Sequence, residues 1–499
     1  MQVAQRQLRR PFSTGLRAKD IPGPKAWPLL GALPDFLQRT GGMAPPKGPM
    51  MLKAHDGYYK EFGSIYKLSL PGDEQIAVCR PETFMQMYRN EGMYPVGGFS
   101  LMWPMVKWAE ETKKQVYLDW IGAGEPWRKI RLTMQEDIIG PRTARTYLPY
   151  INEAMRMASP HLPHFKDEPD VFVTRVAFDM FCSLFYGVQM KTASPSPDPE
   201  HIGFVKDTSE AFRLLGQGIF QPHLKKSIFK YHPFNKKFTA ALERSYAYSS
   251  KLMDQALEMS KQAPTEATKP YIVRVLERES MPVESIKEVA ASVLQAGIDT
   301  TRSVINWNLL YLATHPEKQE LLRRELRETL GDGDLTEDVA ANMKIKLPYL
   351  RGVIRETHRV APPTSIMTAR PALSDLVLDG YNVPAGATVL FNAFSVQNDP
   401  KYVEEPEAFR PERWLPHAVE SRKGTEAEVI DDKLLATPFS FGARMCLGGR
   451  VADLEISAAL AHLIRDWRIS APVEPGSWRT LQPLLSKAHP FPSFKVEPA

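Results

Sequence analysis

A short stretch near the carboxyl end of the chain places one cysteine among residues that could hold a thiolate against a metal ion. Cys446 is preceded by Phe439, Gly442 and Arg444 and followed by Gly448, in the pattern Phe-x-x-Gly-x-Arg-x-Cys-x-Gly. The glycines let the backbone approach closely or adopt a positive φ angle. Amide groups exposed in such a loop can donate to the sulfur and stabilise its negative charge. The pattern therefore predicts a loop that presents a thiolate.

The expected surroundings of Cys446 favour its ionised form. A helical pattern begins at Val451, so the thiol would lie near a helix N-terminus, which lowers the pKa of a cysteine. Arg444 supplies a cation for a nearby anionic group. The alternative interpretation is a buried structural cysteine in a glycine-containing turn, because free cysteines usually behave as small apolar residues. The completeness of the pattern favours metal ligation.

Two residues on a predicted helix could hold anionic groups. Trp127 and Arg131 are four positions apart, so they share one face of a helix. An indole N–H and a guanidinium on the same face can bind carboxylates. Alternatively, the tryptophan packs beneath an arginine whose head group reaches solvent.

A helix predicted from Val283 to Thr314 carries an acid and hydroxyl groups near its middle. Its segment Ala296-Gly-Ile-Asp299-Thr300-Thr contains a glycine, which costs about 1 kcal/mol relative to alanine inside a helix. The threonine hydroxyls can bond back to the preceding turn. This pattern predicts a ligand-sized notch in which the carboxyl and hydroxyl groups move protons. The alternative is a packing glycine with incidental polar neighbours.

Five motifs follow one another along the chain: Trp-x-x-x-Arg, Ala-Gly-x-Asp-Thr-Thr, Glu-x-x-Arg, Pro-Glu-Arg-Trp and the cysteine loop. In this order they resemble the motifs of the cytochrome P-450 family, and the resemblance covers nearly all of the chain after residue 20. It implies a mainly α fold with a small β portion, in which residues 20–499 form a single haem domain.

The resemblance also implies a role for each motif residue. Cys446 is the expected axial thiolate ligand of a haem b (iron protoporphyrin IX), and Asp299 and Thr300 are the expected pair that delivers protons. The residues expected around the cofactor and its propionates are Trp127, Arg131, Arg370, Phe439, Gly442, Arg444 and Gly448. The residues expected in a buried structural network behind the haem are Glu356, Arg359 and Arg413.

The implied activity is that of a haem-thiolate monooxygenase. A thiolate ligand donates electron density to the iron and favours cleavage of the O–O bond. Such an enzyme activates O₂ with two electrons and hydroxylates a lipophilic small molecule, which the resemblance suggests is sterol-like. A haem-thiolate isomerase or dehydratase that uses no O₂ is an alternative, against which the intact Asp299 and Thr300 argue. A non-catalytic haem carrier or sensor is another.

The electrons are expected to come from a separate protein, because no flavin or nicotinamide fingerprint is visible. Arg351 and Arg355 are four positions apart and share a helix face. They resemble the two basic residues with which mitochondrial family members bind an acidic, adrenodoxin-like ferredoxin. The alternatives are a solvated basic face and a microsomal-type enzyme that receives electrons from a diflavin reductase. Gly449 departs from the arginine that is common in mitochondrial members.

Composition and charge restrict the class and the location of the protein. The chain has 499 residues, 43% hydrophobic and 24% charged, with a net charge of +5, which indicates an ordinary globular protein and no nucleic-acid binder. No run of eighteen apolar residues predicts a transmembrane anchor. Residues 1–19 are rich in arginine and hydroxyl groups and contain no acid, which is typical of a mitochondrial transit peptide. A mitochondrial, matrix-side location at the inner membrane is expected.

Several further elements must position the motifs. A hairpin is expected over residues 64–80, with its turn at 71–73 and a helix beginning at Pro81. Residues 171–265 are expected to be mostly helical, and strands with a turn are expected near 366–387. Lysines alternate with aromatic residues within 223–238. This segment could contact an anionic membrane surface or form a solvated loop.

Overall fold

The computed structural model describes residues 16–43, 47–71, 73–97, 102–262, 269–364, 368–436 and 438–499. Most of the presequence expected at residues 1–19 and the start of the strand expected near 366 lie outside the described residues.

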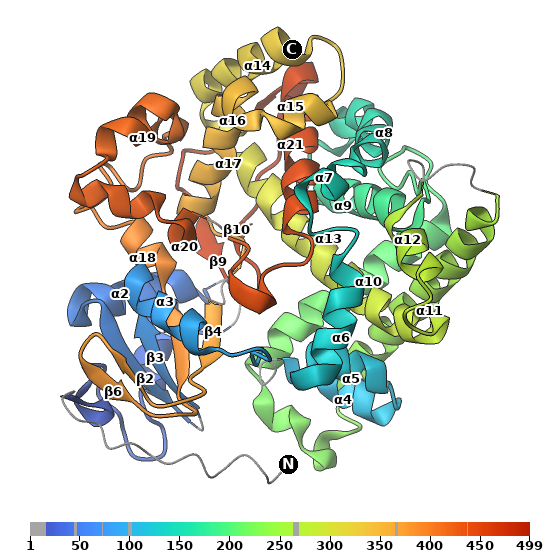
Figure 1. Cartoon of the computed structure of the whole chain (residues 1–499). Coiled ribbons are helices and arrows are strands. Elements are labelled where there is room, and N and C mark those ends of the chain that lie inside the picture. Colours follow the sequence, from blue (N-terminus) through green and yellow to red (C-terminus); the bar gives the residue numbers. More distant parts are fainter. Residues whose placement is uncertain are drawn as a thin grey trace.

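Helices make up most of the molecule, as the sequence predicted (Figure 1). The α-helices are α1 (Leu33–Thr40), α2 (Met51–Phe62), α3 (Pro81–Asn90), α4 (Trp103–Glu111), α5 (Gln115–Ile121), α6 (Gly124–Gln135), α7 (Pro141–Arg145), α8 (Leu148–Ala158), α9 (Pro169–Tyr186), α10 (Pro199–Ile219), α11 (Pro233–Ser260), α12 (Tyr271–Glu277), α13 (Val283–Thr314), α14 (Pro316–Leu330), α15 (Glu337–Ala341), α16 (Met343–Lys346), α17 (Pro348–Val360), α18 (Ala393–Gln397), α19 (Pro416–Arg422), α20 (Lys433–Ala436) and α21 (Gly449–Asp466). The 3₁₀ helices are η1 (Ala18–Asp20), η3 (Ser159–Phe165), η4 (Pro222–Lys225), η5 (Ser227–Phe229), η7 (Pro411–Trp414), η8 (Glu426–Asp431) and η9 (Gly442–Arg444).

Helix α13 crosses the middle of the helical body and packs against α9, α17 and α21 (Figure 1). Its bounds, Val283–Thr314, are those predicted from the sequence. The helix ends because the residue before a proline avoids the α conformation. His315, which precedes Pro316, has φ −133° and ψ 75°. The main hydrophobic core forms where α8, α9, α13 and α21 meet.

The small β portion lies beside the helical body (Figure 1). Its largest sheet has the order β2-β3-β7-β4, from β2 (Ile65–Leu70), β3 (Asp73–Val78), β7 (Thr388–Phe391) and β4 (Thr368–Pro371). Strands β2 and β3 form the predicted hairpin, in which Ile65 pairs with Val78 and Leu70 with Asp73. The remaining strands are β1 (Leu16–Arg17), β5 (Leu376–Leu378), β6 (Tyr381–Val383), β8 (Trp467–Ser470), β9 (Arg479–Leu481), β10 (Lys487–His489) and β11 (Lys495–Pro498).

A second hydrophobic core joins this sheet to α3. Phe84 of α3 stacks on Phe391 of β7, with ring centroids 4.7 Å apart. Phe441, just before the predicted cysteine, packs against the edge of the same core. The cysteine loop therefore lies where the sheet with its helix α3 meets the helical body.

Candidate active site

The cysteine loop is a tight turn that ends directly at a helix. The Cys446 N–H donates to the Phe439 carbonyl at 2.8 Å, and the Met445 N–H donates to the Gly442 carbonyl at 3.1 Å. Gly442 has φ +71°, a conformation that side chains with a Cβ rarely adopt. Helix α21 begins at Gly449, two residues earlier than the predicted Val451.

Burial and its neighbours act on the pKa of Cys446 in opposite directions. Burial raises the pKa of its thiol, although the N–H groups of Gly448 and Gly449 and the guanidinium of Arg131 oppose that rise. The predicted helix N-terminus is present at Gly449, and a helix N-terminus favours the ionised form of a nearby thiol.

Three buried or half-buried arginines gather at this loop. Arg131 and Trp127, both on α6, are buried, and Arg131 Nη2 donates to the Met445 carbonyl at 2.9 Å. The guanidinium of Arg444 lies 3.7 Å from the centroid of the Trp127 ring. Burial, together with the positive charges of Arg370 and Arg131, lowers the pKa of Arg444 to about 10. The mutual repulsion of these cations favours an anionic group among them.

Arg370, on β4, reaches the same cluster and binds an acid that the sequence did not single out. Arg370 Nε donates to Glu91 Oε2 at 3.2 Å, and both side chains are buried. Burial raises the pKa of Glu91, while Arg370 and the Ala443 N–H oppose the rise. Because 279 positions separate the two partners, no local pattern could have revealed this pair.

The acid and the hydroxyl of α13 lie in different surroundings. Asp299 is buried, and its Oδ1 lies 3.2 Å from Nε of Arg302. Burial raises the pKa of Asp299, and Arg302 opposes the rise. Thr300 is half-buried and donates to the Ala296 carbonyl at 2.9 Å. Within the described ranges, no hydrogen bond joins the Asp299 and Thr300 side chains.

Gly297 packs against a ring and forms no notch there. A Cβ at this position would lie 2.6 Å from Cε2 of Phe181, on α9. The glycine therefore brings two helices together, which is the alternative interpretation of the sequence pattern. One residue earlier, Ala296 is exposed in the middle of a helix that is mostly buried. Exposed Ala296 and half-buried Thr300, one turn apart, mark an open face of α13.

A second acid missed by the sequence lies on the other side of α13. Glu455, on α21, is buried, and its Oε2 lies 3.3 Å from the Thr301 hydroxyl. That hydroxyl also lies 3.0 Å from the Gly297 carbonyl, and its single proton cannot serve both acceptors. A protonated Glu455 that donates to Thr301 lets the Thr301 hydroxyl donate to the Gly297 carbonyl. Burial raises the pKa of Glu455 to about 8, which agrees with a neutral carboxyl.

The Glu-x-x-Arg and Pro-Glu-Arg-Trp motifs meet in one buried network. Glu356 accepts from Arg359 Nη2 at 2.8 Å and from Arg413 Nε at 3.1 Å. The indole N–H of Trp414 also donates to Glu356, at 2.8 Å. The network fastens η7 to α17 and stabilises the region behind the cysteine loop.

These residues fit a haem. Cys446 is exposed although it lies deep in the protein, and its thiol is a suitable iron ligand once ionised. Ala296 offers an apolar surface on a helix that packs against α21. The guanidinium groups of Arg131, Arg370 and Arg444 suit the two carboxylates of protoporphyrin IX. A family model described as Cytochrome P450 matches residues 21–491.

The chain belongs to the cytochrome P450 family.

Similar proteins include several mitochondrial P450s. The chain is 28% identical over 472 residues to "Probable cytochrome P450 12c1, mitochondrial" of Drosophila melanogaster, covering 90% of this chain and 86% of that protein. It is 28% identical to "Cytochrome P450 12b1, mitochondrial" of Drosophila acanthoptera, over 90% of this chain and 84% of that protein. It is 24% identical to the mouse "1,25-dihydroxyvitamin D(3) 24-hydroxylase, mitochondrial", over 91% of this chain and 85% of that protein. The family and these relatives make this P450 a haem monooxygenase.

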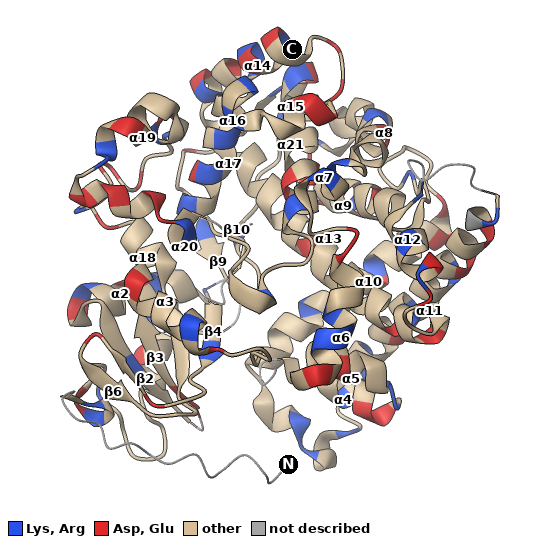
Figure 2. Cartoon of the chain, in the orientation of Figure 1, with Lys and Arg blue, Asp and Glu red and all other residues tan. Residues whose placement is uncertain are grey.

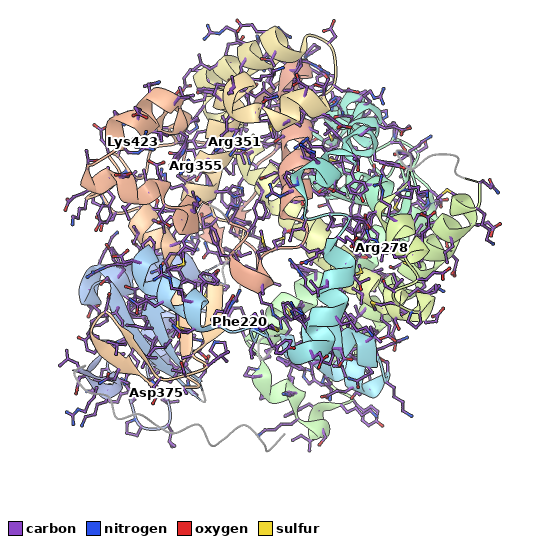
Figure 3. The ribbon with its side chains drawn as sticks, in the orientation of Figure 1. Phe220, Arg278, Arg351, Arg355, Asp375 and Lys423 are labelled. Carbon is purple, nitrogen blue, oxygen red and sulfur yellow. The ribbon has the colours of Figure 1, made fainter. Side chains whose placement is uncertain are left out.

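The two arginines predicted to form a basic pair on α17, Arg351 and Arg355, differ in their exposure to solvent. Both residues lie on the face seen in Figure 3, but only Arg351 is exposed. Arg355 Nη2 lies 3.1 Å from Asp431 Oδ1, and its guanidinium lies 3.9 Å from the Trp414 ring centroid. Burial lowers the pKa of Arg355 to about 10. Lysines and arginines of α6, α17 and α20 surround the cysteine loop on this face (Figure 2).

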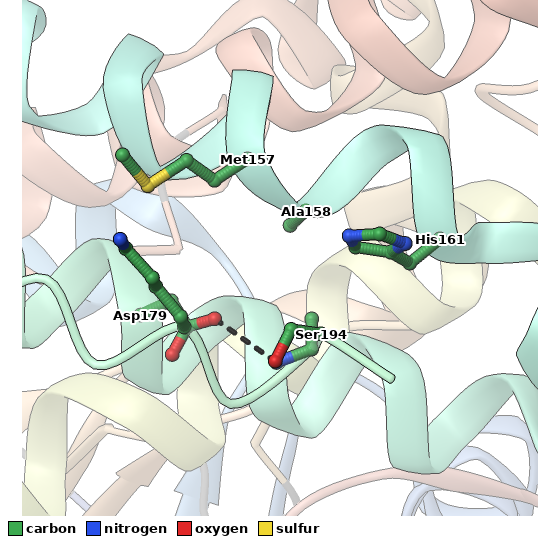
Figure 4. A pocket seen from close by; sticks show the side chains of 7 residues that line it. Met157, Ala158, His161, Asp179 and Ser194 are labelled. Atoms are coloured by element: carbon green, nitrogen blue, oxygen red, sulfur yellow. Dashed lines mark hydrogen bonds between the residues drawn. The ribbon is translucent and has the colours of Figure 1, made fainter. Parts of the chain in front are cut away.

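A separate cavity of the P450 lies away from the cysteine loop, between α8, α9 and the segment that follows α9. Its lining includes Met157, His161 and Asp179 (Figure 4). Asp179 accepts from the Thr192 N–H at 2.9 Å and from the Ala193 N–H at 3.2 Å. The buried carboxylate therefore fastens a chain segment to α9, which is a structural role.

Proposed function

We propose that Cys446 is the axial ligand of a haem b whose two carboxylates lie among Arg131, Arg370 and Arg444, and that the enzyme hydroxylates a lipophilic, sterol-like molecule. The observation that carries this proposal is the exposed thiol of Cys446 beside a cluster of repelling, buried guanidinium groups. When bound, the haem supplies activation of O₂ and insertion of one oxygen atom into a C–H bond.

The chain's own residues would orient the cofactor and supply protons. Arg131 links α6 to the loop through the Met445 carbonyl, so carboxylate binding and loop geometry depend on the same side chain. The Thr300 hydroxyl lies on the open face of α13, where it can hold a proton near the reacting oxygen. Asp299 would return a proton to the Thr300 hydroxyl. Because the carboxyl of Asp299 is buried beside Arg302, its side chain would have to turn toward Thr300 first.

The proposed electron donor is an acidic, adrenodoxin-like ferredoxin. The similarity to proteins named as mitochondrial P450s supports it, as does exposed Arg351 amid other cations on the same face. Arg355 would attract the ferredoxin through its positive charge without touching it, since its guanidinium already contacts Asp431 and the Trp414 ring. A diflavin reductase is the competing donor.

The proposed location is the matrix side of the mitochondrial inner membrane, reached through a transit peptide at residues 1–19. Within the described residues, no helix is long and apolar enough to span a bilayer. The basic–aromatic segment predicted at 223–238 exposes Ile228 (79%) and Tyr231 (74%). Three exposed lysines accompany them, Lys225, Lys226 and Lys230. Apolar side chains ringed by cations suit peripheral contact with an anionic membrane surface.

The test is formation of the ferrous–CO complex driven by NADPH, once with a ferredoxin and its reductase and once with a diflavin reductase. We expect the thiolate-type spectrum with the ferredoxin pair. The same spectrum with the diflavin enzyme alone would overturn the proposed partner, and a histidine-type spectrum would overturn ligation by Cys446.

A matched pair of variants sharpens the partner test. Arg351→Glu should slow ferredoxin-driven reduction about tenfold or more, because a surface charge controls the association rate. Lys423→Glu makes the same charge change at an exposed residue beyond α19 (Figure 3) and should have little effect. Both variants should give the wild-type CO spectrum with chemical reductant. Equal rates for the two variants would remove Arg351 from the docking surface.

A further inference from the structure

Glu91 connects the cysteine loop, the sheet and the arginine cluster. We infer that Glu91 is a positioning residue that holds Arg370 and the Gly442–Ala443 turn in place and sets the net charge that faces the cofactor's carboxylates. This inference rests on the proposed placement of those carboxylates among Arg131, Arg370 and Arg444.

The contacts of Glu91 reach two separate parts of the chain. Glu91 directly follows α3 and is 6% exposed. Its Oε2 accepts from Arg370 Nε at 3.2 Å, which ties it to β4. The Ala443 N–H in η9 lowers the pKa of the same carboxylate, which places Glu91 beside the loop. A charged acceptor paired with a guanidinium makes a strong hydrogen bond.

The fit between Glu91 and the loop leaves no room for a side chain. A Cβ at Gly442 would lie 2.1 Å from Glu91 Oε1. One turn earlier on α3, the Tyr88 hydroxyl lies 3.0 Å from Ser440 Oγ and accepts from the Phe441 N–H at 3.3 Å. Helix α3 therefore holds the loop at two points, and Glu91 is the charged one.

The charge of Glu91 matters because the net charge of the arginine cluster with Glu91 nearly matches the opposite charge of the two haem carboxylates. Three guanidinium groups carry three positive charges, and Glu91, ionised in its pair with Arg370, carries one negative charge, which leaves two positive charges. Protoporphyrin IX carries two carboxylates. Without the charge of Glu91, the site would be more positive, which stabilises the reduced iron and strengthens the hold on the carboxylates.

The experiment compares Glu91→Gln and Glu91→Ala in the haem-loaded enzyme. Glutamine keeps one carbonyl oxygen that can accept from Arg370, and it removes the negative charge. We expect Glu91→Gln to have a higher reduction potential in spectroelectrochemical titration and slower haem transfer to apomyoglobin. Glu91→Ala removes the clamp as well, so it should lose haem faster than the wild type and unfold at a lower temperature.

The control is Asp338→Asn, which removes one negative charge on α15, at the far end of the molecule from α3 (Figure 1). Asp338 pairs with Lys346 at the surface, and its variant should keep the wild-type potential. An unchanged potential in Glu91→Gln, or failure of that variant to retain haem, would overturn the inference. The absence of a thiolate-type CO spectrum in the wild type would instead overturn the proposed function.

Discussion

Replacing Glu455 by glutamine should stabilise the protein at neutral pH. Glu455 is buried between α21 and α13, where its Oε2 lies within hydrogen-bond distance of the Thr301 hydroxyl. Burial raises its pKa from 4.5 to about 8. Glutamine has nearly the same shape as the protonated carboxyl and can donate to Thr301 in the same way, but it cannot ionise.

The magnitude follows from the difference in proton binding between the folded and unfolded chains. Above pH 4.5 the unfolded chain releases the proton of Glu455, whereas the folded protein keeps it until about pH 8. The free energy of unfolding therefore falls as the pH rises through this interval and is level above it. Each pH unit in the interval costs about 1.4 kcal/mol, so at pH 7 the cost is on the order of 3 kcal/mol. Glu455→Gln should recover about 2–3 kcal/mol of this.

The assay is denaturant unfolding of the haem-loaded protein across a pH series, followed by tryptophan fluorescence. The difference between Glu455→Gln and the wild type should be small near about pH 5 and should grow until about pH 8. Glu243→Gln, at an exposed position of α11, is the control and should follow the wild type. If Glu455→Gln and the wild type lose stability in parallel over the whole series, Glu455 is not a neutral buried acid and the reasoning fails.

Two further substitutions test α13. Thr300→Ala should lower the product formed per O₂ consumed by about tenfold or more, because it removes the hydroxyl that holds the proton. Thr314→Ala is the control, because it also deletes a hydroxyl that donates to a carbonyl one turn earlier. If neither variant changes the product formed per O₂ consumed, the role of Thr300 is refuted. Gly297→Ala should destabilise the protein by about 1–3 kcal/mol in thermal unfolding, because its Cβ would lie 2.6 Å from the Phe181 ring. Combining it with Phe181→Leu should recover most of that loss, and a stabilised Gly297→Ala would contradict the packing explanation.

The sequence predicted the parts of the fold in which apolar residues repeat at a regular spacing or in which a proline or a turn marks the end of an element. Helix α13 has the expected bounds because periodic apolar residues end at a proline. The hairpin of β2 and β3 has the expected pairing because its residues alternate around a turn. The Glu356 network could be expected only through the family resemblance, since its members are spread over 58 positions.

The features that the sequence did not reveal depend on single contacts between distant residues. Glu91 meets Arg370 across 279 positions, and Glu455 meets Thr301 across 154. No periodicity reports such contacts. The same limit applies to Arg355, whose spacing from Arg351 indicated a shared face but could not reveal Asp431 beneath it.

The arginine cluster draws on both hydrophobic cores. Arg131 belongs to α6, whose Ile130 and Met134 pack in the main core, whereas Arg370 belongs to β4, in the sheet that forms the second core with α3. A cofactor that both arginines hold would act as a cross-link between the two cores. Binding that favours only the folded chain adds its free energy to folding. The supply of haem would then determine whether the two cores unfold together. Without haem, the two cores would no longer unfold as one unit, although each core would still be folded.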